Sequence, residues 1–137
     1  MTDSSSPALI SYAESAIVED DALLAARTRA AELGTNPVSP SVGALLALLA
    51  RATDARAVVE IGTGTGVSGL WLLNGMAPDG VLTTIDPEPE HHRAARRSFA
   101  GGDIPAGRTR LINGTPTEVL PRLTDASYDL VLSLIHI

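Results

Sequence analysis

The chain has 137 residues, 45% of them hydrophobic, a length and composition that suit one domain with its own core. Its formal net charge is −6, which argues against a nucleic-acid partner, because non-specific binding to phosphates needs basic surfaces. It has no cysteine, so disulfides and thiolate metal sites are excluded, and its ten basic residues are all arginine, so no lysine takes part in catalysis.

The N-terminus shows no targeting signal. Residues 1–7 lack the basic start and apolar centre of a secretory signal, and we expect them to form a flexible tail. No uninterrupted apolar stretch approaches the roughly 20 residues of a membrane span. The sequence therefore predicts a soluble cytoplasmic protein without a membrane partner.

Residues 8–53 are predicted to form an N-terminal helical region, a lid, with two helices. Apolar residues recur at near-helical spacing from Ala8 to Leu33, and Gly34 follows as a stop. Ser39 or Ser41 is expected to cap a second helix, from Val42 to about residue 52. The acids of the first helix are expected to form a solvated face: Glu14, Glu19, Asp20 and Asp21.

Strands and helices alternate in the rest of the chain, a partial cofactor-binding domain predicted over residues 54–131. Predicted strands cover 57–61, 81–86 and 109–113, and a fourth begins at Tyr128. Predicted helices cover 67–76, 89–100 and 117–123. Such alternation predicts an α/β fold, with about four parallel strands and helices on both faces of the sheet.

The most informative segment is the glycine-rich turn after the first strand. The strand contains Glu60 and runs directly into Gly62, Gly64 and Gly66, and Asp86 ends the next strand. Glycine lets the backbone turn sharply and lets a ligand approach closely. A strand-end acid can accept hydrogen bonds from ribose hydroxyls, so the pattern predicts a nucleoside-containing cofactor at the carboxyl ends of the strands.

Two kinds of cofactor fit this turn. Gly64, Gly66 and Gly69 match a dinucleotide fingerprint, and Asp86 follows about 20 residues later, as a ribose-binding acid does. S-adenosylmethionine is favoured by Glu60 at the strand end and by the two helices before the first strand. It is also favoured by Ser68, which lies where a helix begins and where free amides attract a carboxylate.

The residues around the glycine turn narrow the choice between these two kinds of cofactor. The chain resembles bacterial O-methyltransferases related to catechol and caffeoyl-CoA O-methyltransferases, which are class I enzymes with a Rossmann-like fold. The resemblance covers residues 8 to about 131 and is carried by four segments, Val38-Ser39-Pro40, the turn from Val58 to Gly69, Leu82 to Asp86, and Tyr128-Asp129-Leu130-Val131.

The resemblance implies S-adenosylmethionine as cofactor and a role for each matching residue. Val38 would line the cofactor from the lid, Ser68 would bind its carboxylate and Asp86 its ribose. Glu60, Gly62 and Thr63 would lie under its methionine part, and Gly64 would also contact the cofactor. Where the family often has Gly-Asp-Ala, this chain has Gly114-Thr115-Pro116, and proline has no N–H to offer adenine. Thr115 and Pro116 are therefore expected to hold adenine by the threonine side chain or by packing.

Other candidate residues are predicted to be structural. His91 and His92 are expected to form a solvated helix start rather than a metal site, because adjacent residues do not share a helix face. Trp71 is expected in the core. Arg93, Arg96 and Arg97 are expected on an exposed helical face.

The end of the chain departs from the family pattern. Family members carry a metal-binding aspartate where this chain has Leu134, and residues 132–137 are predicted to be a non-native tail. The resemblance implies a longer parent that binds a divalent metal such as Mg²⁺, methylates a hydroxyl of a small, for example phenolic, acceptor, and forms a homodimer. The chain itself is expected to be an inactive fragment without catalytic or metal residues. An NAD(P)-dependent oxidoreductase and a catalytically silent cofactor-binding module remain alternatives.

Overall fold

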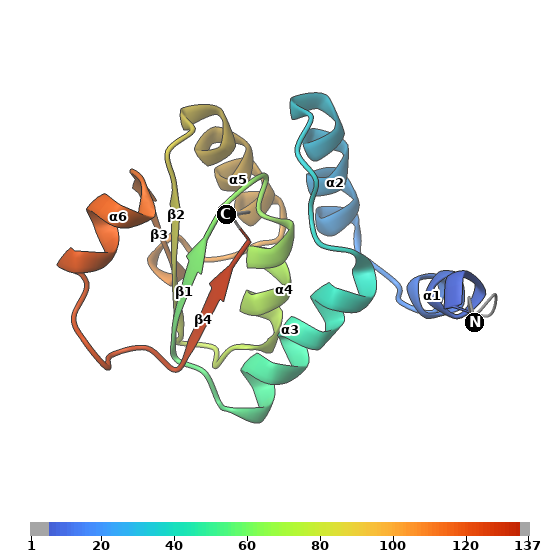
Figure 1. The fold of residues 1–137 in the computed structure, drawn as a ribbon, viewed down its shortest axis with the longest axis horizontal. Helices are drawn as coiled ribbons and strands as arrows, with labels where there is room; N and C mark the ends of the chain where they lie inside the picture. Colours follow the sequence, from blue (N-terminus) through green and yellow to red (C-terminus); the bar gives the residue numbers. More distant parts are fainter. Residues whose placement is uncertain (1–5, 135–137) are drawn as a thin grey trace.

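The computed structural model describes residues 6–134 (Figure 1). Six helices and four strands alternate along the chain in this order: α1 (Ser6–Ser15), α2 (Asp21–Leu33), α3 (Pro40–Ala52), β1 (Ala57–Ile61), α4 (Val67–Gly75), β2 (Val81–Asp86), α5 (Pro89–Gly101), β3 (Thr109–Asn113), α6 (Pro116–Val119) and β4 (Leu130–Ser133). A short 3₁₀ turn, Ala106–Arg108, precedes β3. A second one, Leu120–Arg122, extends α6.

The four strands form one parallel sheet in the order β3-β2-β1-β4. The central strands β1 and β2 are rich in β-branched residues and are buried along nearly their whole length, as expected of parallel strands covered by helices. Strand order reverses at β1, because the chain first moves from β1 to β2 and β3 and then returns to place β4 on the other side. The α/β fold with four parallel strands is therefore confirmed.

Helices cover the two faces of the sheet unequally. Right-handed crossovers place α4 and α5 on the same face, since both connect strands that advance in one direction. In Figure 1, α2 and α3 pack outside this layer, while only α6 lies on the opposite side of the sheet. The core fills the space between α4 and the sheet, with side chains such as Leu72, Leu73, Val58 and Leu82.

Close packing of α3 on α4 depends on a small residue. A Cβ atom added to Gly75 would lie 2.1 Å from the carbonyl oxygen of Ala47. No side chain fits at that distance, so the two helices approach at the backbone itself. This contact fixes the helical layer against which β1 and its following turn are built.

The N-terminal region differs from its prediction. The single helix expected from Ala8 to Leu33 is wrong: α1 ends at Ser15, and α2 begins only at Asp21, so three helices precede β1. Asp20 interrupts the helix because its side chain accepts a hydrogen bond from the N–H of Leu23 at 2.9 Å, as an N-cap residue does. Gly34 ends α2 as predicted, in the left-handed conformation with φ +67°.

One acid of the expected solvated face is buried instead. The Glu19 side chain, 5% exposed, accepts bidentate hydrogen bonds from Arg27 at 2.6 and 2.9 Å and a third from Trp71 Nε1 at 3.1 Å. The prediction for Glu19 is therefore wrong. Glu14 bonds the N–H and hydroxyl of Ser41 and so attaches α1 to the start of α3.

The first three strands have the predicted bounds, and β4 begins two residues later than expected. Asp129 explains the later start, because its carboxylate accepts hydrogen bonds from the N–H groups of Arg56 and Ala57 at 2.8 and 3.0 Å. These bonds hold the pKa of Asp129 below its usual value. The predicted helix over 117–123 is shorter than expected, since α6 passes into a 3₁₀ turn at Leu120.

Two predicted terminal segments lie partly outside the described residues. Of the tail predicted over 1–7, residues 6 and 7 belong to α1 and residues 1–5 are outside the described part. Of the segment 132–137, residues 132 and 133 complete β4 and residues 135–137 are outside. Within residues 6–134, none of the helices combines the length and the apolar character needed to span a membrane.

Candidate functional site

The turn between β1 and α4 is built from glycines in the left-handed region. Gly62, Gly64 and Gly66 have φ values of +97°, +52° and +92°, which side-chain-bearing residues rarely adopt. The N–H of Gly62 donates to the carbonyl of Ile85 at 2.8 Å, so the turn leaves β1 beside the end of β2. The predicted sharp bend is confirmed, and it brings backbone N–H groups to the carboxyl edge of the sheet.

Asp86 lies at the tip of β2, directly beside this turn. Its Oδ2 atom accepts hydrogen bonds from the N–H of Gly64 at 3.2 Å and from Nδ1 of His91 at 3.0 Å. Its Oδ1 atom accepts one from the N–H of Glu88 at 2.9 Å. The side chain is nearly buried, and these donors hold its carboxylate in one orientation at the edge of the turn.

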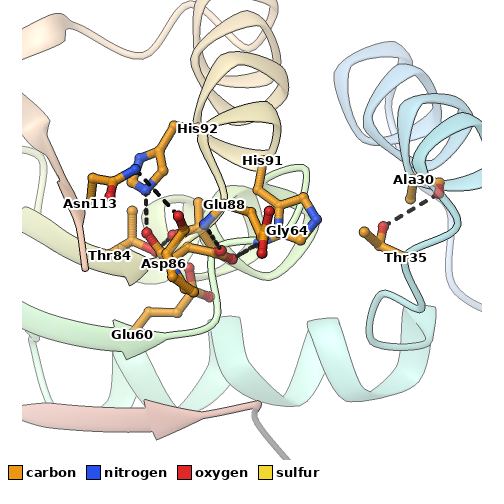
Figure 2. Close-up of polar contacts among 12 residues, drawn as sticks. Ala30, Thr35, Glu60, Gly64, Thr84, Asp86, Glu88, His91, His92 and Asn113 are labelled. Atoms are coloured by element: carbon orange, nitrogen blue, oxygen red, sulfur yellow. Dashed lines mark hydrogen bonds and ion pairs between the residues drawn. The ribbon is translucent and has the colours of Figure 1, made fainter. Parts of the chain in front are cut away.

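Both histidines at the start of α5 contact Asp86, so the prediction of a solvated helix start is wrong. His92 is 8% exposed, and its Nε2 atom donates to the backbone carbonyl of Asp86 at 2.7 Å. His91 reaches the carboxylate instead (Figure 2). Adjacent residues point in different directions on a helix. At the start of a helix, however, both can still reach the end of the preceding strand. Sequence spacing alone does not reveal such contacts.

Glu60 lies beneath the turn in a network of hydroxyl groups. It is fully buried, and it accepts hydrogen bonds from Ser68 and, at 2.7 Å, from Thr84, whose hydroxyl lies 2.7 Å from that of Thr63. Burial raises the pKa of Glu60 to about 7, although the two hydroxyl donors favour its ionised form. A weakly acidic carboxyl group therefore lies directly behind the start of α4.

A cavity of about 220 Å³ opens above these residues. It lies at the carboxyl ends of β1 and β2, where strand order reverses and where ligands bind in open α/β sheets. Six of the predicted cofactor residues line it: Val38, Gly62, Thr63, Gly64, Ser68 and Asp86. Val38 reaches it from the loop between α2 and α3, which is part of the region 8–53 predicted to form a lid.

Three predicted residues lie outside the cavity wall. Glu60 is fully buried and does not line the cavity, although Ser68, which donates to it, does. Thr115 and Pro116 begin α6, beyond the end of β3. The N–H of Thr115 donates to Glu118 at 3.1 Å, and its hydroxyl lies 3.1 Å from that of Thr117, so both groups already have partners within α6. Contact of Thr115 and Pro116 with adenine stays a prediction.

Several lining residues were not predicted: Thr35, Asn36, Pro37, Thr65, Val67, His91 and Leu134. Three of them precede Val38 in the same loop. A helix stop at Gly34 followed by Pro37 and Pro40 signals a fixed loop, but the sequence does not show where that loop lies. Leu134 lines the cavity because β4 runs parallel to β1 and ends at the same edge of the sheet.

The site offers few groups that could bind a metal ion. Across residues 6–134, no group of three or more His, Cys, Asp or Glu side chains is placed to hold a metal ion. His91 and Asp86 contact each other, but they contribute only two such groups to the cavity.

Comparisons with known proteins point to one family. The family model described as a methyltransferase domain matches residues 59–134. A curated relative from Mycobacteroides abscessus, provisionally named an O-methyltransferase, is 61% identical over 125 residues, which is 91% of this chain and 58% of the relative. The chain thus spans little more than half the length of the relative.

Solved structures share the same fold. A Corynebacterium glutamicum protein superposes with a TM-score of 0.84 at 36% identity, over 91% of this chain and 59% of that chain. The O-methyltransferase TomG from Streptomyces achromogenes, involved in tomaymycin synthesis and solved in complex with SAM, superposes with a TM-score of 0.81 at 32% identity. That match covers 90% of this chain and 57% of TomG. The predicted Rossmann-like methyltransferase fold is thereby confirmed.

Proposed function

Because this chain belongs to the methyltransferase domain family, we propose that it forms the cofactor-binding part of an S-adenosylmethionine-dependent O-methyltransferase. The observation that carries the proposal is the cavity in which the glycine turn, Ser68 and Asp86 meet. The chain spans 58% of the relative from M. abscessus, so methyl transfer is proposed for the longer protein. TomG, which binds SAM in its solved structure, supports the choice of cofactor.

Asp86 binds the ribose of the cofactor in this proposal. Its carboxylate accepts hydrogen bonds only, and the ribose hydroxyls are donors. The N–H groups of Gly64 and Glu88 hold the carboxylate in place before the ligand arrives. Little conformational freedom is lost on binding, which favours affinity.

The methionine part lies at the start of α4. The Ser68 hydroxyl donates to Glu60, so that proton is not available to the ligand carboxylate. The first-turn N–H groups of α4 bind the carboxylate instead, because they have no partner within the helix and carry the positive end of its dipole. Glu60 acts through Ser68 and Thr84, as a positioning residue whose negative charge favours the cationic end of the cofactor.

The remaining predicted residues enclose the cofactor. Gly62, Thr63 and Gly64 form the floor of the cavity, and Val38 covers it from the lid loop. Adenine extends toward the start of α6, where we expect the Thr115 hydroxyl and the ring of Pro116 to contact it. We propose the same division as the sequence predicts, into a lid region, residues 8–53, and a cofactor-binding region, residues 54–131.

The chemistry requires an acceptor hydroxyl aligned with the sulfonium methyl group. Enclosing the donor in a fixed orientation lowers the entropic part of the barrier. We propose a small, phenolic-type hydroxyl acceptor, and a homodimer for the longer parent, on the basis of the resemblance. A divalent metal belongs to the same resemblance, but the described residues supply no ligand set that fits it, so no step is assigned to a metal.

Calorimetric titration of the 137-residue chain tests the proposal. We expect saturable binding of S-adenosylhomocysteine and no binding of NAD, which would exclude the oxidoreductase alternative. Methyl transfer is tested separately, in a fusion in which residues 1–131 replace the matching segment of the M. abscessus relative. Methylation of a catechol-type acceptor by the fusion supports the enzyme, whereas cofactor binding without methylation of any hydroxyl acceptor indicates the silent module.

A further inference from the structure

Asp86 has little remaining capacity to accept hydrogen bonds. An ionised carboxylate offers about four acceptor positions. Three are already used, by the N–H of Gly64, Nδ1 of His91 and the N–H of Glu88. One position remains, on Oδ1. The two neighbouring hydroxyls of a ribose carry two donors, so Asp86 accepts one of them and the second needs another acceptor.

His91 has the chemistry of that second acceptor. An ionised carboxylate cannot donate, so the bond to Asp86 requires the proton of the neutral ring to be on Nδ1. Nε2 then carries a free lone pair. Among the described residues no hydrogen-bond partner of Nε2 is found, and the half-buried ring lines the cavity beside Asp86 (Figure 2).

Hydroxyl side chains also line the cavity, but each of them bonds a group other than Asp86. Thr63 bonds Thr84, Thr65 donates to the carbonyl of Ala26 at 2.8 Å, and Ser68 donates to Glu60. Thr35 contacts the carbonyl of Ala30 at 3.4 Å, and these two residues lie apart from Asp86 in Figure 2. Within the described lining, His91 is the side chain that bonds the Asp86 carboxylate directly, so the acceptor position on its Nε2 atom lies next to that carboxylate.

We propose that His91 binds one ribose hydroxyl through Nε2 while its Nδ1 holds Asp86 in place to bind the other. This inference rests on the proposed function, because it assumes a ribose-bearing cofactor in the cavity. It assigns the recognition of the sugar to a pair of residues, one from the tip of β2 and one from the first turn of α5. A cofactor without the two hydroxyls gains nothing from His91.

The variant His91→Asn separates the two roles of the ring. An asparagine amide can replace the Nδ1 donor to Asp86, but it does not extend to the position of Nε2. Calorimetry with S-adenosylhomocysteine and with its 2′,3′-dideoxy analogue measures the effect. We expect His91→Asn to weaken binding of S-adenosylhomocysteine about fivefold, the effect of one lost hydrogen bond, and to change binding of the analogue less than about twofold.

Two further variants serve as controls for His91→Asn. Arg93→Ala, on the exposed face of the same helix, is expected to bind both ligands as the unmodified chain does. His91→Gln, whose amide reaches the Nε2 position, is expected to keep the preference for the hydroxyl-bearing ligand. Imidazole ¹⁵N spectra of the unmodified chain give a reading that needs no variant, since the Nε2 resonance should shift with S-adenosylhomocysteine and not with the analogue.

Three results would overturn the inference: equal loss of affinity for both ligands, tighter binding of S-adenosylhomocysteine by His91→Asn, or an Nε2 resonance that ignores the sugar hydroxyls. Equal loss would make His91 a structural support of the cavity, and tighter binding would make it a competitor for Asp86. If the unmodified chain bound neither ligand, the proposed function itself would fail. The two failures are therefore distinguishable.

Discussion

The backbone N–H of Gly64 donates a hydrogen bond to the Oδ2 atom of Asp86 over 3.2 Å. This bond joins the bend after β1 to the acid at the tip of β2, two features separated in the sequence by a helix and a strand. The bend and the carboxylate therefore form one preorganised edge of the cavity. Both residues are needed for the sugar-binding role proposed for the site.

Asp86→Asn tests the charge in that role. Asparagine keeps the size of the side chain but replaces one acceptor oxygen by a donor, so a charge-assisted hydrogen bond to the ribose is lost. We expect affinity for S-adenosylhomocysteine to fall about tenfold to a hundredfold by calorimetry. Asp79→Asn, at an exposed acid that pairs with Arg56, is the control and should bind normally. Equal affinities of Asp86→Asn and the unmodified chain would argue against ribose binding by Asp86.

Glu60 should make stability depend on pH. Its pKa in the folded chain, about 7, lies above the usual value of 4.5, so between these values the folded state binds more protons than the unfolded state. The free energy of unfolding therefore falls as pH rises through this window, by an amount on the order of 3 kcal/mol. Below pH 4.5 Glu60 is protonated in both the folded and the unfolded state, so its burial no longer lowers the free energy of unfolding.

Glu60→Gln removes the loss of stability that comes from ionising a buried carboxyl group. Its amide stays neutral and can still bond both Ser68 and Thr84, so we expect the variant to be more stable than the unmodified chain at pH 8 and not at pH 5. Urea unfolding at several pH values measures the difference. Parallel stability curves for the two proteins would contradict the ionisation assigned to Glu60.

The same carboxylate should distinguish the two forms of the cofactor. S-adenosylmethionine carries a sulfonium charge that S-adenosylhomocysteine lacks, and a buried anion behind the cavity favours the cation. As pH rises from 6 to 8 and Glu60 ionises, the affinity for S-adenosylmethionine relative to S-adenosylhomocysteine should increase. Titrations with Glu60→Gln should give a constant ratio, and a constant ratio in the unmodified chain would refute the coupling.

Two glycines of the fold should respond differently to alanine. At Gly75, a Cβ atom would collide with the carbonyl oxygen of Ala47, so we expect a loss of more than about 3 kcal/mol as α3 and α4 separate. At Gly64, φ is +52° but nothing lies within 4 Å of an added Cβ, so we expect only about 1 kcal/mol of backbone strain. Thermal unfolding compares the two, and equal losses would refute the packing argument.

Much of the sheet could be predicted from local sequence. β1 and β2 are short runs rich in β-branched residues and bounded by turn residues, the glycines follow the end of β1, and Asp86 ends β2. Parallel topology then brings those ends to one edge, so the main parts of the cavity could be anticipated without coordinates. The residues predicted in this way are those whose role depends on their position along one element.

Contacts between elements could not be predicted. Glu19 has the sequence context of a surface acid, and only the fold brings Arg27 and Trp71 to it. The break before α2 depends on the Asp20 cap, which competes with a continuous apolar pattern. His91 was misjudged for the same reason, since its partner belongs to the preceding strand rather than to its own helix.

The central claim is that a ribose-bearing sulfonium cofactor occupies the cavity between the glycine turn and Asp86. Amide chemical shifts of the ¹⁵N-labelled chain, titrated with S-adenosylmethionine, test it most directly. The claim predicts saturable shifts at Gly62, Gly64 and Ser68 together with Val38 of the lid, and unchanged resonances at Arg110 on the outer strand β3. Shifts confined to other parts of the sheet, or no shifts at saturating ligand, would contradict it.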